Sequence, residues 1–131
     1  MPLDHLGIGV PDMESARAYY DALAPLVGFV PFGSGDGWFA YAPDGDTGVQ
    51  LFFYPAQSDA AYDGDATGLQ HLCFRVGTRA EVDAAHAWAV AGGDQILHPP
   101  RVFAEYHPLH YATYWLEPRG FKLEVVSFAN P

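Results

Sequence analysis

Residues 69–76, Leu-Gln-His-Leu-Cys-Phe-Arg-Val, repeat the pattern of residues 3–10, Leu-Asp-His-Leu-Gly-Ile-Gly-Val. Both stretches share the frame Leu-x-His-Leu-x-x-x-Val, and each matched residue stands 66 positions after its counterpart. Short runs rich in branched and aromatic residues are typical of β-strands, so each stretch predicts a strand with a histidine in its first half. Two such strands predict two structural repeats that each offer a histidine to one site.

The elements that follow the two strands are expected in the same order in both halves. Asp12 and Thr78 are predicted N-caps, also 66 positions apart, of helices that end near residue 24 and at residues 92–93. Turns are expected at residues 33–37 and 43–46. Further strands are expected at residues 29–32, 38–42, 49–54, 95–97, 111–116 and 121–128. The order β-α-β-β-β, read twice, predicts the α+β class.

The repeat also sets the expected domain organisation. The 131 residues predict one domain, with module one at about residues 3–54 and module two at about residues 68–128. Residues 55–67 are small, polar and acidic without periodicity, which predicts a linker. A long loop is expected at residues 99–110.

Composition narrows the class of partner. The chain has 16 acidic and 6 basic residues, a formal net charge of −10, which argues against nucleic acid and anionic membrane surfaces. Cys73 is the only cysteine, so no disulfide forms within the chain and a reducing cytoplasm is the expected compartment. No signal peptide is recognised, and no apolar run approaches the ~20 residues that span a bilayer. A small-molecule substrate is the expected partner.

Four polar residues occupy matched strand positions and are the candidate metal ligands. Glu124 stands in the centre of an apolar strand, where a buried carboxylate requires a cation or strong hydrogen bonds. Its counterpart in the first half is Gln50, and the strand histidines are His5 and His71. This set suits one divalent ion, Zn²⁺, Ni²⁺, Co²⁺, Mn²⁺ or Fe²⁺, and contains the two-histidine, one-carboxylate set of non-haem iron sites. The alternatives are hydrogen-bonded core histidines, a glutamine paired with backbone and a glutamate that faces water.

Six further residues are candidate substrate contacts. Tyr106, His107 and His110 crowd a loop, where they could form a lid and supply an acid, a base or a hydrogen-bond donor. Phe52 and Tyr54 share strand parity with Gln50, which predicts either an aromatic pocket lining or ordinary packing. Arg75 shares parity with His71 and could meet a substrate anion or a surface carboxylate.

The paired β-α-β-β-β order, with its four matched polar positions, resembles the vicinal oxygen chelate superfamily over about residues 3–128. This superfamily includes glyoxalase I, methylmalonyl-CoA epimerase, extradiol dioxygenases, fosfomycin-resistance thiol transferases and metal-free bleomycin-binding proteins. The resemblance implies a half-open barrel of two modules around the metal, and a substrate whose adjacent oxygens bind the ion. It also implies a homodimer, in which the four ligands come from one chain or from two.

Within that superfamily, the His-Gln-His-Glu set is similar to the ligands of methylmalonyl-CoA epimerases, whereas bacterial glyoxalase I has Glu in place of Gln50. An amide is not a useful base near neutral pH, so Glu124 is the expected catalytic residue as well as a ligand. The leading prediction is a glyoxalase I-like lyase or isomerase. The alternatives are an iron-dependent extradiol-type dioxygenase and a metal-free protein that binds a drug or metabolite.

Overall fold

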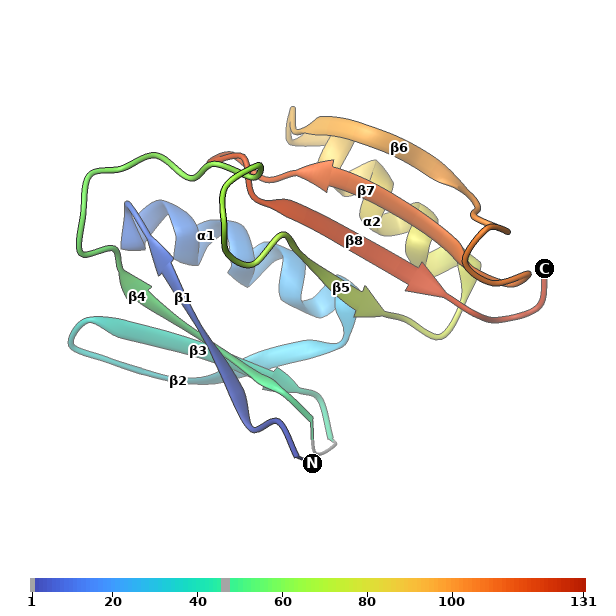
Figure 1. Cartoon of the computed structure of the whole chain (residues 1–131). Helices are drawn as coiled ribbons and strands as arrows, with labels where there is room; N and C mark the ends of the chain where they lie inside the picture. Colours follow the sequence, from blue (N-terminus) through green and yellow to red (C-terminus); the bar gives the residue numbers. More distant parts are fainter. Residues whose placement is uncertain (1, 46–47) are drawn as a thin grey trace. The chain divides into compact units, whose positions relative to one another are not determined.

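The structure, a computed structural model, describes residues 2–45 and 48–131 and divides into two compact units, Met1–Ala60 and Ala61–Pro131. Each unit has the strand and helix order β-α-β-β-β and one four-stranded mixed sheet (Figure 1). The α+β class and the tandem modules are therefore confirmed. Of the turn expected at residues 43–46, residue 46 lies outside the described residues.

The first unit has its strands in the order β1-β4-β3-β2. Strand β1 runs parallel to β4, and the other pairs are antiparallel. Asp12 caps α1, because its side chain accepts hydrogen bonds from the backbone N–H groups of Glu14 and Ser15. Pro31 lies in edge strand β2, where proline does not interrupt a central ladder. The elements are β1 (His5–Val10), α1 (Met13–Leu23), the 3-10 helix η1 (Ala24–Val27), β2 (Phe29–Gly35), β3 (Trp38–Pro43) and β4 (Gln50–Pro55).

The core of the first unit lies between α1 and one face of its sheet. Phe53 is fully buried and its ring contacts Tyr20 of α1 at 4.5 Å and Phe39 of β3 at 4.9 Å between centroids. Because side chains alternate along a strand, the residues on either side of Phe53 project from the opposite face. That face carries Phe52, whose ring lies 5.2 Å from the ring of His5. The candidate residues of this unit are therefore on the face away from α1.

The second unit repeats this arrangement with strand order β5-β8-β7-β6. The Thr78 hydroxyl accepts from Glu81 N–H and donates to the Glu81 carboxylate, so Thr78 caps α2 as expected. Val82, Ala85 and Ala89 of α2 are fully buried. The elements are β5 (His71–Arg75), α2 (Arg79–Ala91), β6 (Gln95–Val102), β7 (Tyr111–Leu116) and β8 (Lys122–Ser127).

Strand β6 is longer than the sequence predicted. It continues through Pro99 and Pro100 to Val102, so the expected loop at residues 99–110 is shortened to residues 103–110. Two prolines are tolerated because β6 is an edge strand, and its pairing with β7 shifts register between His98 and Arg101. His98 consequently lies on this strand.

Helix α2 covers one face of the second sheet and leaves the other for the candidate site. Thr113 of β7 faces the helix, since its hydroxyl lies 3.4 Å from Nδ1 of His86 in α2. Residues of the opposite parity, such as Tyr114, project from the other face. We call this face, away from α2, the open face of the second sheet.

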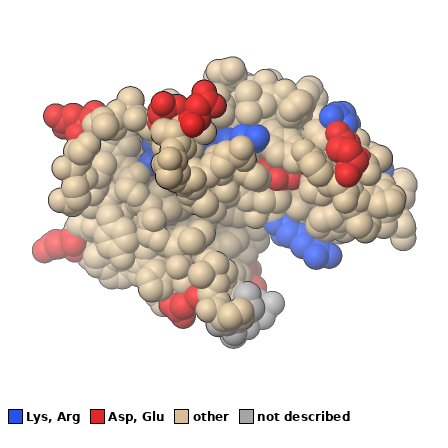
Figure 2. Space-filling model, viewed as in Figure 1, with Lys and Arg blue, Asp and Glu red and all other residues tan. Residues whose placement is uncertain are grey.

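Two general properties bear on possible partners. Among the described residues, no helix has the length and apolar character required to cross a membrane. On the face drawn in Figure 2, acidic side chains lie at separate points with few basic ones between them. The surface is thus acidic, in keeping with the net charge of −10.

Candidate functional site

Glu124 is the centre of the candidate site. It lies in the middle of β8, where the strand register pairs it with Cys73 of β5 and with Tyr114 of β7. The residue is only 3% exposed although its side chain is ionisable. A buried carboxylate requires hydrogen bonds or a cation, so its surroundings decide what it can do.

Four side chains contact the Glu124 carboxylate. Its Oε1 lies 3.2 Å from Nε2 of His71, and its Oε2 lies 2.9 Å from Nε2 of His110. The Tyr114 hydroxyl and the Cys73 thiol also hydrogen-bond to the carboxylate. An ionised carboxylate offers about four acceptor positions, so these contacts occupy much of its capacity. His71 and His110 contact different oxygens of the same group.

The contact between His71 and Glu124 brings two hydrogen-bond acceptors together without a donor between them. His71 Nδ1 lies 2.8 Å from Oε1 of Gln70, an oxygen that can only accept, so Nδ1 carries the proton of a neutral imidazole. The lone pair on Nε2 then faces the Glu124 oxygen, which is also an acceptor. This acceptor pair is satisfied by a second proton on the ring, by a protonated carboxyl group or by a cation between the two atoms.

The first unit carries the same imidazole arrangement. His5 Nδ1 lies 2.7 Å from Oδ2 of Asp4, so this ring also directs its proton to the preceding residue and leaves Nε2 free. His5 is the register partner of Gln50 on β4, and both lie on the face away from α1. Asp4 and Gln70 occupy equivalent positions in the repeat. Such outer partners fix the tautomer and orientation of metal-binding histidines.

Tyr114 and Cys73 are held in their protonated forms. Desolvation by the surrounding protein, followed by the hydrogen bond to Glu124, raises the pKa of the Tyr114 hydroxyl above its usual value. Desolvation around the sulfur, and then the charge of Glu124, likewise raises the pKa of the Cys73 thiol, although the residue keeps an exposed surface. Both groups therefore act as hydrogen-bond donors to the carboxylate, and Cys73 is a poor nucleophile.

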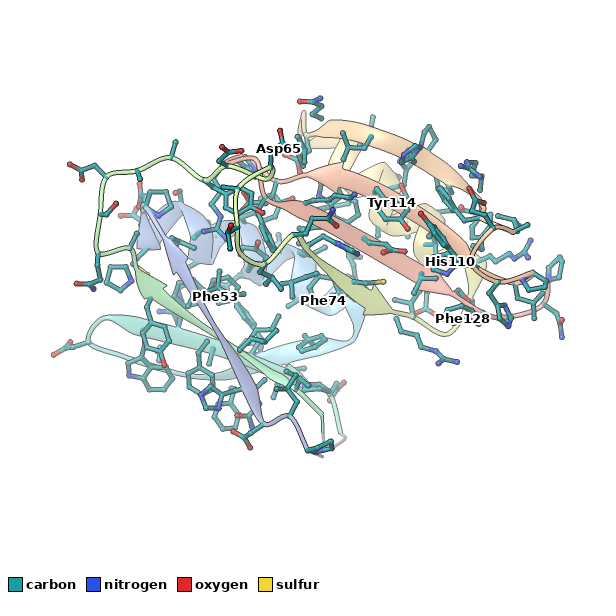
Figure 3. All side chains as sticks on the ribbon, in the orientation of Figure 1. Phe53, Asp65, Phe74, His110, Tyr114 and Phe128 are labelled. Carbon is teal, nitrogen blue, oxygen red and sulfur yellow. The ribbon has the colours of Figure 1, made fainter. Side chains whose placement is uncertain are left out.

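The loop at residues 103–110 brings one of its three predicted residues to Glu124. Backbone hydrogen bonds from Phe103 N–H to His110 C=O, and from His110 N–H to His107 C=O, hold the loop in a compact form. His110 is half-buried and contacts the carboxylate, and Figure 3 shows it near Tyr114 and Phe128. Tyr106 is 68% exposed, and Nδ1 of exposed His107 accepts from the N–H of Leu109. Only His110 is therefore placed to act on Glu124.

The other predicted substrate contacts lie on the open faces of the two sheets. Phe52 stacks with Tyr54 and with Trp38 in the first unit, at centroid distances of 6.4 and 5.6 Å. Arg75 lies on the same face of β5 as His71, but its guanidinium rests 4.9 Å from the centroid of the Phe128 ring. The first unit thus carries an aromatic surface of Trp38, Phe52 and Tyr54, whereas Arg75 of the second unit packs on a single ring.

The donor atoms around Glu124 fit a divalent ion only in part. A nitrogen and an oxygen that each lie about 2.1 Å from one ion are separated by about 3 Å, which matches His71 Nε2 and Glu124 Oε1. Over residues 2–45 and 48–131, however, no group of three or more His, Cys, Asp or Glu side chains is arranged to hold a metal. His71 and Glu124 by themselves would supply two ligands to an ion, and further ligands would be required to complete a coordination shell.

The sequence reasoning overlooked three contributors to this arrangement. Tyr114 donates to Glu124 because it is the register partner on β7, a pairing that is set by the hairpin. Asp4 and Gln70 orient the two imidazoles, and their signal was present in the repeat, since each precedes a matched histidine. Asp4 and Gln70 could therefore have been predicted from the sequence as the polar residues that precede the two strand histidines.

Comparison with known proteins gives a clear family match. The model of the Glyoxalase/Bleomycin resistance protein/Dioxygenase superfamily matches residues 2–125. No match was found among the curated proteins.

Solved structures resemble this chain along nearly its whole length. A candidate glyoxalase from Bacillus halodurans is 27% identical, with a TM-score of 0.77 over 95% of this chain and 94% of that one. A glyoxalase/bleomycin resistance protein from Albidiferax ferrireducens is 22% identical, with a TM-score of 0.76 and complete coverage of both chains. A fosfomycin resistance protein from Listeria monocytogenes is 15% identical, with a TM-score of 0.69 over 95% and 91% of the chains. The last two likenesses show the fold alone.

Proposed function

Because this chain belongs to the glyoxalase/bleomycin resistance protein/dioxygenase superfamily, we propose that it is a divalent-metal-dependent lyase or isomerase of the glyoxalase type. Its substrate is a small molecule with two adjacent oxygen atoms. The proposed ligands are His71 and Glu124 in the second unit, with His5 and Gln50 from the first unit of the same chain or of a second copy.

The acceptor pair formed by His71 Nε2 and Glu124 Oε1, 3.2 Å apart, carries this proposal. His71 and Glu124 would hold a cation through these two atoms, since the contact of Nδ1 with Gln70 leaves Nε2 of the ring free to bind it. The same tautomer at His5, fixed by Asp4, supports a ligand role for that ring as well. When bound, a divalent ion supplies a Lewis acid for the adjacent oxygens of a substrate.

The residues around Glu124 support proton transfer beside that ion. An isomerase of this type moves a proton between neighbouring carbon atoms, which requires a base and a partner that returns the proton. Glu124 is the carboxylate at the site, and His110 Nε2 lies 2.9 Å from its second oxygen. We assign Glu124 as the ligand and base, and His110 as the group that shares its proton. The Tyr114 hydroxyl donates a hydrogen bond to Glu124.

Metal analysis of the purified protein tests the proposal. We expect about one equivalent of Zn²⁺, Ni²⁺, Co²⁺, Mn²⁺ or Fe²⁺ per chain, and its loss in His71→Ala and Glu124→Gln. Retained circular dichroism would show that the variants fold. Sub-stoichiometric metal in the unmodified protein, even after reconstitution, would overturn the proposal in favour of a metal-free binding protein. Turnover of methylglyoxal with a thiol then tests the glyoxalase reaction.

A second candidate is an iron-dependent dioxygenase of the extradiol type. It is favoured by Tyr114 and His110, which place a hydroxyl group and a second imidazole against Glu124. If the bound metal is Fe²⁺ and the protein consumes oxygen with catechol, this activity replaces the isomerase.

The homodimer predicted from the sequence gives the proposal a second test. If the first-unit ligands come from a second copy, dilution that dissociates the protein will release metal and abolish activity. Constant activity per chain on dilution to the monomer would assign all four ligands to one chain.

A further inference from the structure

A depression of about 350 Å³ lies in the second unit, at the end of its sheet where β7 ends and β8 begins. The segment of the second unit that precedes β5 forms one wall through Tyr62, Asp65 and Gln70. The sheet forms the other wall through Leu116 and Lys122. Figure 3 shows Asp65 on the loop beside this end of the sheet.

The loop wall is held in place by one tyrosine. The Tyr62 hydroxyl donates to the backbone carbonyl of Leu69 at 2.8 Å, which closes residues 62–69 into a compact loop. Its ring contacts Phe121 edge-on, with 5.2 Å between centroids, and so fastens the loop to the sheet. The depression therefore has two ordered walls.

Lys122 is the cation of this depression and the only lysine in a chain of net charge −10. Arg17, Arg101 and Arg119 each lie within 4.0 Å of a carboxylate oxygen. Lys122 enters no salt bridge within the described part of the chain, and its ammonium lies 5.3 Å from the centroid of the Tyr114 ring. Its charge is thus available to a ligand.

The depression adjoins the proposed metal pair. Lys122 is the register partner of His71 and precedes Glu124 by two residues, so the three side chains share the open face. Gln70 connects the two sites directly, because it lines the depression and accepts from Nδ1 of His71. A ligand group in the depression therefore lies beside Gln70, which contacts the proposed metal ligand His71.

We propose that the depression binds the carboxylate end of a short substrate whose adjacent oxygens bind the metal, and that Lys122 pairs with this carboxylate. Leu97 and Leu116 contact the carbon chain between the two ends. Exposed Asp65 at the rim selects a singly charged carboxylate over a phosphate, since it repels a second negative charge. The link to the metal rests on the proposed function, whereas the carboxylate site stands on the depression itself.

The carboxylate site is tested on the metal-free protein by NMR titration with butyrate, and with butyramide as the uncharged isostere. Butyrate should cause saturable shifts of the backbone N–H signals of Gly64, Gln70 and Gly120, and butyramide should not. Lys122→Gln should weaken butyrate binding by about tenfold, the usual effect of losing a charged hydrogen bond. Arg17→Gln, which removes the same charge from the first unit, should leave it unchanged.

Several outcomes would overturn the carboxylate site. Equal shifts with butyramide, or butyrate binding that survives Lys122→Gln, would show that Lys122 does not pair with the ligand. Shifts confined to residues outside the depression would move the site elsewhere. Inorganic phosphate that binds as tightly as butyrate would remove the selectivity assigned to Asp65.

The link to the metal is tested by calorimetry on the metal-loaded protein. 2-Oxoglutarate has adjacent oxygens at one end and a carboxylate at the other, whereas 2-oxopentanoate lacks the second carboxylate. We expect 2-oxoglutarate to bind about tenfold more tightly than 2-oxopentanoate. This difference in affinity should be lost in Lys122→Gln, while the metal content stays unchanged. An unchanged preference would overturn the link. Absence of metal would overturn the proposed function instead, and the butyrate titration would still decide the carboxylate site.

Discussion

His110 Nε2 lies 2.9 Å from Oε2 of Glu124, and this contact joins the loop between β6 and β7 to the middle of β8. Because His110 engages Oε2, the carboxylate presents Oε1 to His71. The orientation of the proposed ligand is thus set by a residue on another element.

We therefore predict that His110→Ala weakens metal binding without abolishing it. Loss of an outer partner of a metal ligand typically costs 10–100-fold in affinity, and we expect about tenfold here. The affinity is measured by competition with a chromophoric chelator.

His107→Ala is the matched control for this prediction. It removes an imidazole from the same loop, but His107 is exposed and its Nδ1 accepts a hydrogen bond from the backbone N–H of Leu109 in that loop. Equal losses of affinity in the two variants would indicate a general effect of the loop and would contradict a specific role for His110.

The partner of His71 gives a second prediction. Gln70→Ala removes the oxygen that holds the proton on Nδ1, so the ring is free to protonate Nε2 and turn away from the metal. We expect a 10–100-fold loss of metal affinity, and a recovery in Gln70→Glu, which restores an acceptor. Gln57→Ala, an exposed glutamine outside both strands, should leave the affinity unchanged. Equal affinities of the Gln70→Ala and unmodified proteins would contradict the orienting role.

The comparison of sequence and structure shows which parts of such a site can be predicted. That His71 and Glu124 lie on one face followed from the sequence, because strand parity is a local property of the chain. The predicted match of Gln50 with Glu124 was wrong in register, since Gln50 pairs with His5 whereas His71 pairs with Lys122 and Glu124 with Cys73. The role of His110 did not follow, because it depends on how residues 103–110 fold back onto the sheet. Local patterns also favoured a loop at Pro99 and Pro100, whereas pairing with β7 keeps both in an edge strand. Contacts between elements cannot be predicted from the periodicity of the sequence, because they depend on the tertiary structure.

Adjacent phenylalanines of β4 give a prediction on stability. Phe53 is fully buried against α1 and stacks on Phe39, whereas Phe52 lies on the opposite face and is partly exposed. Phe53→Ala should lower the free energy of unfolding by about 3–5 kcal/mol through the cavity it leaves. Phe52→Ala should lower the free energy of unfolding by clearly less, since less of the Phe52 surface is removed from water. Urea unfolding of both variants checks this order, and equal losses would contradict the assignment of the two faces.

Stability at high pH is the last prediction, and it concerns Tyr41. Burial, and then the hydrogen bond from its hydroxyl to Asp21 at 2.6 Å, raises the pKa of Tyr41 above the ordinary value of 10.0. Above pH 10 the unfolded chain loses this proton while the folded chain keeps it, so ionisation favours unfolding. Stability from this group is therefore fully present below about pH 10 and is lost as the pH rises further, by up to about 1.4 kcal/mol per pH unit.

The variant Tyr41→Phe separates the contribution of Tyr41 to the pH dependence of stability from the contributions of the other tyrosines. The variant should lose about 1 kcal/mol near pH 8 with the hydrogen bond to Asp21, yet its stability should fall less steeply above pH 10. The free energy of unfolding in urea at pH 8, 10 and 11 measures both quantities. Tyr111 and Tyr114, whose pKa values are also raised, are present in both proteins and cancel in the comparison. Identical slopes above pH 10 would contradict the role of Tyr41, because only its hydroxyl differs between the two chains.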